Sequence, residues 1–153
     1  MYKSYVEVIS LVERLHRQFL EVVKLELDGL GIRDLNNAQG LLLFNIGDAE
    51  MTVRELMLRG CYLGSNLSYN LKKLVENGYL SQERSEHDHR STNVRLTEKG
   101  TKLRDRLRSM HQCHAEMLER AAITDEDLHA AAVTLRRLES FWTLLPDIKA
   151  AAA

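Results

Sequence analysis

The stretch Asp88-His89-Arg90-Ser91-Thr92-Asn93-Val94-Arg95-Leu96-Thr97-Glu98-Lys99-Gly100 predicts a β-hairpin arm that runs directly into a long helix. A charged tip at residues 86–90 separates two strand candidates, residues 80–84 and 93–96. Thr97 can cap the following helix, and Glu98 places a negative charge in its first turn, where the helix dipole favours it. The arm therefore has the form of a wing attached to a helix.

Residues 52–80 precede this arm and predict a helix-turn-helix. Thr52 and Glu55 have the spacing of a capping box that opens a short helix, which Gly60 ends. A second helix is expected to begin at Gly64 or Ser65 and to end at Gly78. One face of this helix carries the apolar side chains Leu67, Leu71, Leu74 and Val75. A reading helix followed by a basic hairpin is typical of a winged helix-turn-helix, which indicates sequence-directed DNA binding.

Long helices are expected on both sides of this lobe, because the chain has a single proline, Pro146. Apolar residues at helical spacing predict helices over residues 2–28, 36–46 and 98–121, and a last helix that begins at Thr124 and is closed by Pro146. Two of these helices begin with capping-box pairs, Asn36 with Gln39 and Thr124 with Asp127.

The expected fold class is mainly α with a small β-hairpin wing. It has an N-terminal dimerisation helix (1–34), a winged helix-turn-helix DNA-binding lobe (35–97), C-terminal dimerisation helices (98–149) and a tail (150–153), which act as one continuous functional unit. Dimerisation is expected because the apolar stripes of the terminal helices are too extensive for a small winged helix alone to cover. Twofold symmetry would place two reading helices about 34–36 Å apart, one turn of DNA. A monomeric helical domain with its own core is the alternative.

Composition gives mixed support for a DNA partner. The 153 residues carry a net charge of −1, whereas DNA-binding proteins are often basic. Residues 51–100, however, hold eight Lys and Arg against six Asp and Glu, a local charge of +2. The overall acidity keeps open a protein–protein adaptor that uses the winged helix for a partner other than DNA; salt-sensitive DNA binding would distinguish the two.

Two sets of side chains are candidates for DNA contact. On the reading helix they are Ser65, Asn66, Ser68, Tyr69, Asn70, Lys72 and Lys73. Ser and Asn can bond base edges, with Asn able to pair two-pronged with adenine, and the lysines supply charge for phosphates. On the wing they are Arg84, His87, Asp88, His89, Arg90 and Arg95. Asp88 can pair with Arg90 to fix the loop, and an Arg there suits a narrow minor groove.

The order of elements and the pattern D-x-R-x-x-x-V-x-L-T-x-x-G resemble the MarR family of bacterial transcription regulators. The pattern is carried by Asp88, Arg90, Val94, Leu96, Thr97 and Gly100. Upstream, Leu74-x-x-x-Gly78-Tyr79-Leu80 is similar to the end of the family's recognition helix, and the string Gly60-Cys-Tyr-Leu-Gly-Ser-Asn66 is similar to the LdtR-like alphaproteobacterial branch.

The resemblance implies a dimeric repressor whose wing Arg90 touches the minor groove. It also implies an effector pocket between the dimerisation helices and the DNA-binding lobe, for which Phe19, Leu42 and Met110 are candidate lining residues. Tyr69 stands where the family often has an Arg early in the recognition helix, which leaves the DNA sequence preference open but not the fold.

The remaining chemistry-bearing residues give weaker expectations. Cys61 and Cys113 could serve a redox-sensing regulator, but free Cys is most often a small buried apolar residue, and burial is expected for both. His111, Cys113 and His114, with His16, lack the spacing of a strong zinc motif, so no metal and no cofactor is expected.

No nucleophile elbow, phosphate loop or dinucleotide fingerprint is present, so no catalytic residue and no enzyme activity is expected. The sequence lacks an apolar run of about 18 residues and a signal peptide, which predicts a cytoplasmic protein without a membrane partner.

Overall fold

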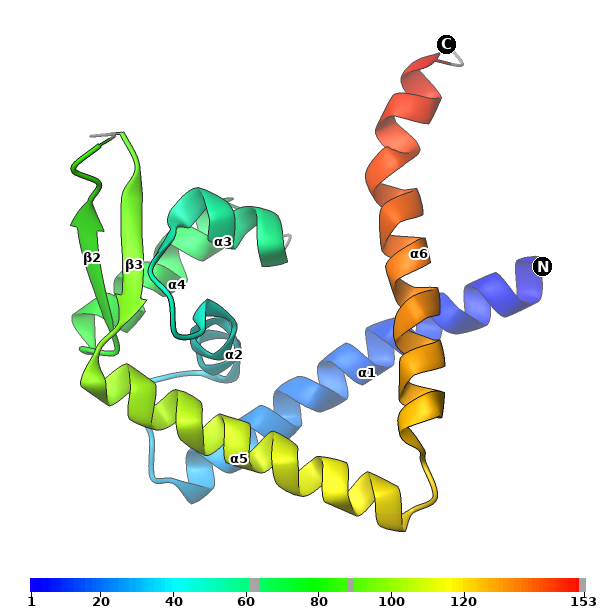
Figure 1. Cartoon of the computed structure of the whole chain (residues 1–153), viewed down its shortest axis with the longest axis horizontal. Coiled ribbons are helices and arrows are strands. Elements are labelled where there is room, and N and C mark those ends of the chain that lie inside the picture. Colours follow the sequence, from blue (N-terminus) through cyan, green and yellow to red (C-terminus); the bar gives the residue numbers. More distant parts are fainter. Residues whose placement is uncertain (61–63, 88–89, 152–153) are drawn as a thin grey trace. The chain divides into compact units, whose positions relative to one another are not determined.

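The computed structural model describes residues 1–60, 64–87 and 90–151 of the chain. In chain order the elements are α1 (Tyr2–Gly29), α2 (Asn37–Ile46), β1 (Met51–Thr52), α3 (Val53–Gly60), α4 (Gly64–Glu76), β2 (Leu80–Arg84), β3 (Thr92–Leu96), α5 (Glu98–Arg120) and α6 (Asp125–Ala151) (Figure 1). They form two units, Met1–Met110 and His111–Ala153. Helices with a small antiparallel sheet confirm the predicted fold class. None of the helices in the described ranges is long and apolar enough to span a membrane.

The sheet has three strands, in the order β1-β3-β2, and both pairings are antiparallel. The two strands of the expected hairpin are present, and β3 begins one residue earlier than predicted, at Thr92. The sequence analysis missed β1, which pairs Met51 with Val94 and Thr52 with Asn93. A strand of two residues is too short to show an alternating pattern, so only its partner reveals it.

The core of the first unit gathers apolar side chains from helices α1 to α5 and from all three strands of the sheet. Helix α2 lies deepest, since Leu42, Leu43 and Ile46 are at most 2% exposed. On α4 the buried side chains are Leu67, Leu71 and Leu74, and their spacing of four and three residues leaves the opposite face of the helix outside the core.

The expected helix caps are present with the predicted partners. Asn36 Oδ1 accepts from the backbone N–H of Gln39 at 2.8 Å, and Gln39 Oε1 accepts from the N–H of Asn36 at 3.1 Å. Thr52 and Glu55 form the same reciprocal pair before α3, as do Thr124 and Asp127 before α6. Each box satisfies two backbone donors that the first turn of a helix leaves without intrahelical partners.

The prediction that Pro146 closes the last helix is wrong, because α6 continues to Ala151. Proline removes one backbone donor and crowds the preceding turn, but it does not prevent helical φ, and the alanines that follow favour the helix. The expected tail, 150–153, therefore begins inside α6, and its last two residues lie outside the described part of the chain.

Candidate nucleic-acid interface

Helix α4 presents a polar face opposite its buried leucines. Ser65, Asn66, Ser68 and Lys72 are exposed, and the Tyr69 side chain is 59% exposed. Ser65, Asn66 and Ser68 are small hydrogen-bonding groups and Tyr69 is an aromatic ring, all on the first two turns of the helix, and Lys72 adds a positive charge on the third. Such a face matches what a recognition helix needs to bond base edges and phosphates in a major groove.

Asn70 departs from the expectation that it points outward. It is half-buried, and its Oδ1 accepts a hydrogen bond from Nε2 of Gln39 on α2 at 3.2 Å. The reason is its place on the helix, three residues after Leu67 and four before Leu74, which puts it beside the buried stripe and not opposite to it.

The two lysines of α4 are not free positive charges. Glu76 lies 3.1 Å from Lys73 Nζ and 3.8 Å from Lys72 Nζ, and Lys73 Nζ also lies 5.9 Å from the ring centre of Tyr69. The hydrogen bond to Glu76 raises the pKa of Lys73. Glu76 therefore reduces the positive charge that this end of the helix offers to phosphates.

The wing is the hairpin of β2 and β3, which pair in register from Leu80 with Leu96 to Arg84 with Thr92 (Figure 1). Because alternate residues of a strand face opposite sides, Arg84 shares the face of Leu80. Arg95, opposite Ser81, lies on the other face. Both arginines are exposed, and they lie on opposite faces of the hairpin.

At the wing tip, His87 and Arg90 are exposed. Asp88 and His89 lie outside the described residues, so the pairing of Asp88 with Arg90 stays a prediction. The backbone N–H of His87 donates to Ser85 Oγ at 3.3 Å, which helps to shape the turn that leaves β2.

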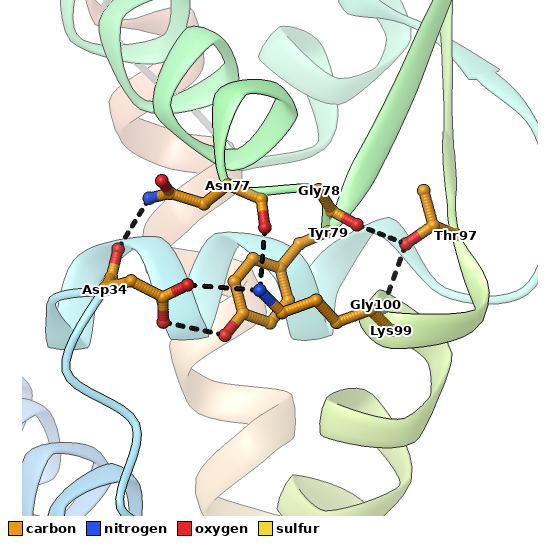
Figure 2. A network of polar contacts seen from close by, with 7 residues as sticks. All are labelled: Asp34, Asn77, Gly78, Tyr79, Thr97, Lys99 and Gly100. Carbon is orange, nitrogen blue, oxygen red and sulfur yellow. Dashed lines mark hydrogen bonds and ion pairs between the residues drawn. The ribbon is translucent and has the colours of Figure 1, made fainter.

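A polar network joins the end of α4 to the start of α5 and to the loop between α1 and α2 (Figure 2). Gly78, at φ +79°, ends α4 in the left-handed conformation. The N–H of Gly78 donates to Val75 O at 3.0 Å, and that of Tyr79 donates to Leu74 O at 2.9 Å, the two bonds of a Schellman cap. The chain thus leaves α4 in one fixed direction.

Asp34 lies at the centre of this network. Its carboxylate accepts from Tyr79 Oη at 2.8 Å and lies 3.2 Å from Lys99 Nζ, and its backbone carbonyl accepts from Asn77 Nδ2 at 2.7 Å. Lys99 Nζ also donates to Asn77 O at 2.8 Å and lies 4.1 Å from the ring centre of Tyr79. One loop residue therefore holds the cap of α4 and the first turn of α5 together.

The charges of this network are matched. Burial opposes ionisation of Asp34, but hydrogen bonds from Tyr79 and Lys99 outweigh it and hold the pKa of that carboxyl below its ordinary value. Burial, with the hydrogen bond to Asp34, raises the pKa of Tyr79. The tyrosine hydroxyl therefore stays protonated and remains a donor to the carboxylate.

Thr97 and Gly100 complete the junction by bringing backbones together. Thr97 Oγ1 donates to Gly78 O at 2.6 Å and accepts from the N–H of Gly100 at 3.1 Å, so it caps α5 and binds the cap of α4 at once. A Cβ on Gly100 would lie 2.1 Å from Tyr79 O. Gly100 is therefore required for close approach of the two segments.

A second tie connects the loop before β1 to α5. The guanidinium of Arg104, only 4% exposed, bonds Asp48, and its Nε and Nη2 lie 3.0 and 2.9 Å from Asp105 Oδ1. The hydrogen bond from Arg104 lowers the pKa of Asp48. Because this buried guanidinium is paired with two carboxylates, it fixes the position of the loop relative to α5.

Sequence reasoning missed Asp34, Tyr79 and Lys99 as a group, and it missed Gln39 as a partner of Asn70. Gly78 and Thr97 gave a local signal through turn and cap chemistry. Asp34 gave none, because its partners are 43 to 65 residues away in the chain.

The other candidates are placed as follows. Leu42 and Met110 are buried in the hydrophobic core, and Phe19 packs against that core. All three therefore contribute to core packing, and their role in binding an effector stays a prediction. Cys113 is exposed, against the expectation of burial, because it lies beyond the buried stripe of α5 that ends at Met110. Cys61 lies outside the described residues. Within the described ranges no three His, Cys, Asp or Glu side chains are grouped to hold a metal ion.

Comparison with known proteins identifies the same lobe. A family model described as a winged helix DNA-binding domain matches residues 35–100. The exopolysaccharide II synthesis transcriptional activator ExpG of Rhizobium meliloti (strain 1021) is 39% identical over 139 residues, which cover 91% of this chain and 72% of that protein.

Solved structures with this fold are less similar in sequence. Streptococcus pneumoniae FabT in complex with DNA has a TM-score of 0.72 at 20% identity, over 92% of this chain and 99% of that one. A MarR transcriptional regulator from Methanosarcina mazei Go1 has a TM-score of 0.73 at 20% identity, over 90% of this chain and 97% of that one. The S. aureus MepR–DNA complex has a TM-score of 0.70 at 19% identity, over 87% of this chain and 96% of that one. With the ExpG match over most of both chains and this fold, the chain belongs to the MarR family of winged helix transcription regulators, which bind DNA and are not enzymes.

Proposed function

We propose that this regulator binds a pseudo-palindromic operator as a homodimer, with residues 65–73 of α4 in the major groove and Arg90 of the wing in the flanking minor groove. The observation that carries the proposal is the polar face of α4, held against α5 through Asp34, Tyr79 and Lys99. A reading helix fixed in this way can transmit the geometry of a dimer to two half-sites. Such a regulator acts in the cytoplasm, where its operator lies.

Double-stranded DNA is the partner that the face of α4 suits. Ser65, Asn66 and Ser68 offer donors and acceptors for base edges, and Tyr69 offers a ring and a hydroxyl. Two solved relatives of the same fold, FabT and MepR, are described in complex with DNA.

A second copy of the chain is the partner that the terminal helices suit. On α1, Tyr2 is 79% and Leu15 is 59% exposed, and on α6, Phe141 is 47% and Leu144 is 55% exposed. Large apolar side chains left in water on long helices are typical of an interface that another copy covers. Light scattering after size exclusion at micromolar concentration should give a dimer, and a stable monomer would contradict this.

The direction of regulation has two candidates. The family resemblance implies a repressor, which would bind over promoter elements. The 39%-identical relative is named a transcriptional activator, and this favours activation. Deleting the gene and measuring transcripts of the adjacent operon distinguishes them, because loss of a repressor raises those transcripts and loss of an activator lowers them.

We also propose that a small effector shifts the spacing of the two reading helices. A cleft of about 280 Å³ beside the α4–α5 junction has Leu30, Ile32 and Leu103 in its walls and Lys99, Lys102 and Arg106 around them. Lys99 is already bonded to Asp34 and Lys102 to Glu98, so Arg106 is the cation that would hold a carboxylate whose apolar body lies against these walls. A ligand of this class acts only if it binds one of the two states better, so tight binding with unchanged operator affinity would refute the effector proposal.

The test is fluorescence anisotropy of the purified protein with the DNA upstream of its own gene, against scrambled DNA, at two salt concentrations. Tight, selective and salt-sensitive binding is expected. The Arg90→Ala protein should bind the operator at least tenfold more weakly (about 1.4 kcal/mol) and remain a dimer. Equal affinity of the two proteins would refute the wing contact, and equal weak binding to both DNAs would refute operator binding at this site.

A further inference from the structure

Gln39 is a buried polar residue, 5% exposed, in the first turn of α2. Both ends of its amide are hydrogen-bonded: Oε1 accepts from the backbone N–H of Asn36, and Nε2 donates to Asn70 Oδ1 on α4. The capping box uses only the oxygen. The amide nitrogen therefore connects the cap of one helix to a side chain of the reading helix.

The backbone N–H of Asn36 fixes the direction of both of these hydrogen bonds. A backbone N–H can only donate, so the atom of Gln39 that faces Asn36 must be the oxygen. The group of Gln39 that faces Asn70 is then the NH2, which can only donate. Asn70 must therefore accept this hydrogen bond with its side-chain oxygen. The orientation of the Asn70 amide thus follows from a backbone group on a different helix.

The Asn70 amide has one end bonded and one end available. Its Oδ1 is directed at α2, and its Nδ2 makes no hydrogen bond within the part of the chain that the structure describes. Asn70 is half-buried, so the nitrogen is the end left for a partner outside the protein.

We infer that Gln39 is a positioning residue that turns the Asn70 amide so that its Nδ2, and not its Oδ1, faces DNA as a hydrogen-bond donor. The inference rests on the proposed placement of α4 in the major groove. Two-pronged pairing with adenine needs both amide atoms of an Asn at one base edge, and Gln39 holds one of them. The partner of Asn70 is therefore an acceptor: guanine O6 or N7, thymine O4, adenine N7 or a phosphate oxygen.

The decisive variant is Gln39→Glu. A Glu side chain keeps the oxygen that accepts from Asn36, and Glu is a usual residue of a capping box, so the cap is retained. A carboxylate cannot donate to Asn70, so the Asn70 amide must turn, bond through Nδ2 and present Oδ1 outward. Facing an acceptor on DNA, that oxygen should weaken operator binding about tenfold, or about 1.4 kcal/mol.

A double-mutant cycle separates this effect from the added negative charge. In an Asn70→Ala background, Gln39→Glu should change operator affinity by less than about twofold, because the group through which Gln39 acts is gone. The same loss in both backgrounds would overturn the inference, since it would mean that the charge or the fold is responsible.

A readout without DNA checks the turn of the amide itself. In ¹⁵N spectra of the free protein, the Asn70 side-chain NH2 should exchange with water more slowly in Gln39→Glu than in the wild type. If exchange is unchanged, the positioning role is refuted even where the operator is bound normally. Selective operator binding by the wild type tests the proposed function separately, so the two failures are distinguishable.

Should Gln39→Glu fail to fold, Asn70→Asp asks the same question. Asp keeps an acceptor for Gln39 and replaces the outward NH2 by oxygen, so it should bind the operator more weakly than Asn70→Ala; equal affinity would overturn the inference. Operators with single base-pair changes identify the acceptor. If Asn70→Ala loses discrimination at one position, the acceptor is a base, and a uniform loss over all operators assigns it to a phosphate.

Discussion

Replacing Gly100 by alanine should destabilise the protein, although the same change in most helices stabilises it. The new Cβ would lie 2.1 Å from Tyr79 O, whereas ordinary contact begins at 3.4 Å. The Tyr79 carbonyl cannot simply retreat, because it accepts from the N–H of Thr97 at 3.1 Å and lies in the junction between α4 and α5. The two backbones must move apart.

The expected magnitude is a net loss of about 2 kcal/mol. Forcing a methyl group against backbone costs about 1–3 kcal/mol, and weakening the Thr97–Tyr79 hydrogen bond costs about 1 kcal/mol. Higher helix propensity of alanine returns up to about 1 kcal/mol. For a chain of this length, the thermal midpoint should fall by about 4–8 °C, measured by circular dichroism at fixed protein concentration.

Gly40→Ala is the matched control. It also replaces a buried helical glycine, but the nearest atom to its Cβ is Cδ1 of Leu27 at 3.2 Å, the end of a flexible side chain. Its thermal midpoint should stay within about 3 °C of the wild type. A Gly100→Ala protein as stable as the wild type, or more stable, would refute the argument from close approach.

Three further outcomes are expected. Asp34→Asn should lose about 1 kcal/mol in urea unfolding at pH 7. Because folding lowers the pKa of Asp34, the stability that its carboxylate contributes is present above its ordinary pKa of 3.8 and disappears as the pH falls through the lower folded value. A difference in unfolding free energy between Asp34→Asn and the wild type that persists at pH 2 would contradict this role. Glu76→Gln should release Lys72 and Lys73, tightening operator binding a few-fold and steepening the salt dependence by about one phosphate contact; an unchanged slope would exclude those lysines from the DNA contact. Ala122, at φ +61°, should accept glycine with a gain of about 1 kcal/mol in the free energy of unfolding, and a loss would show that its left-handed conformation carries no strain.

Most elements could be predicted from local chemistry. Capping boxes at Asn36, Thr52 and Thr124 and the glycine cap at Gly78 placed helix boundaries, because the groups that satisfy a helix end lie within a few residues of it. The helix end predicted at Pro146 was wrong. Proline costs the helix one backbone hydrogen bond and crowds the preceding turn, and the helix preference of neighbouring residues can outweigh that cost.

The candidate site was predicted in part. The polar residues of α4 follow from the spacing of its buried leucines, and the wing follows from the hairpin pattern. The direction of Asn70 does not, because a residue at the border of the buried stripe is turned inward or outward by whatever neighbour it meets, here Gln39.

The sequence by itself determined the helices, the two strands of the wing, their order and the polar face of α4, since these depend on spacing and on groups a few residues apart. Only the tertiary structure decided that Asp34 joins α4 to α5, that Gly100 lies against Tyr79 and that Gln39 turns the Asn70 amide. These contacts join residues 21 to 65 positions apart, and no local pattern specifies such pairs, because they depend on how the packed core brings the helices together.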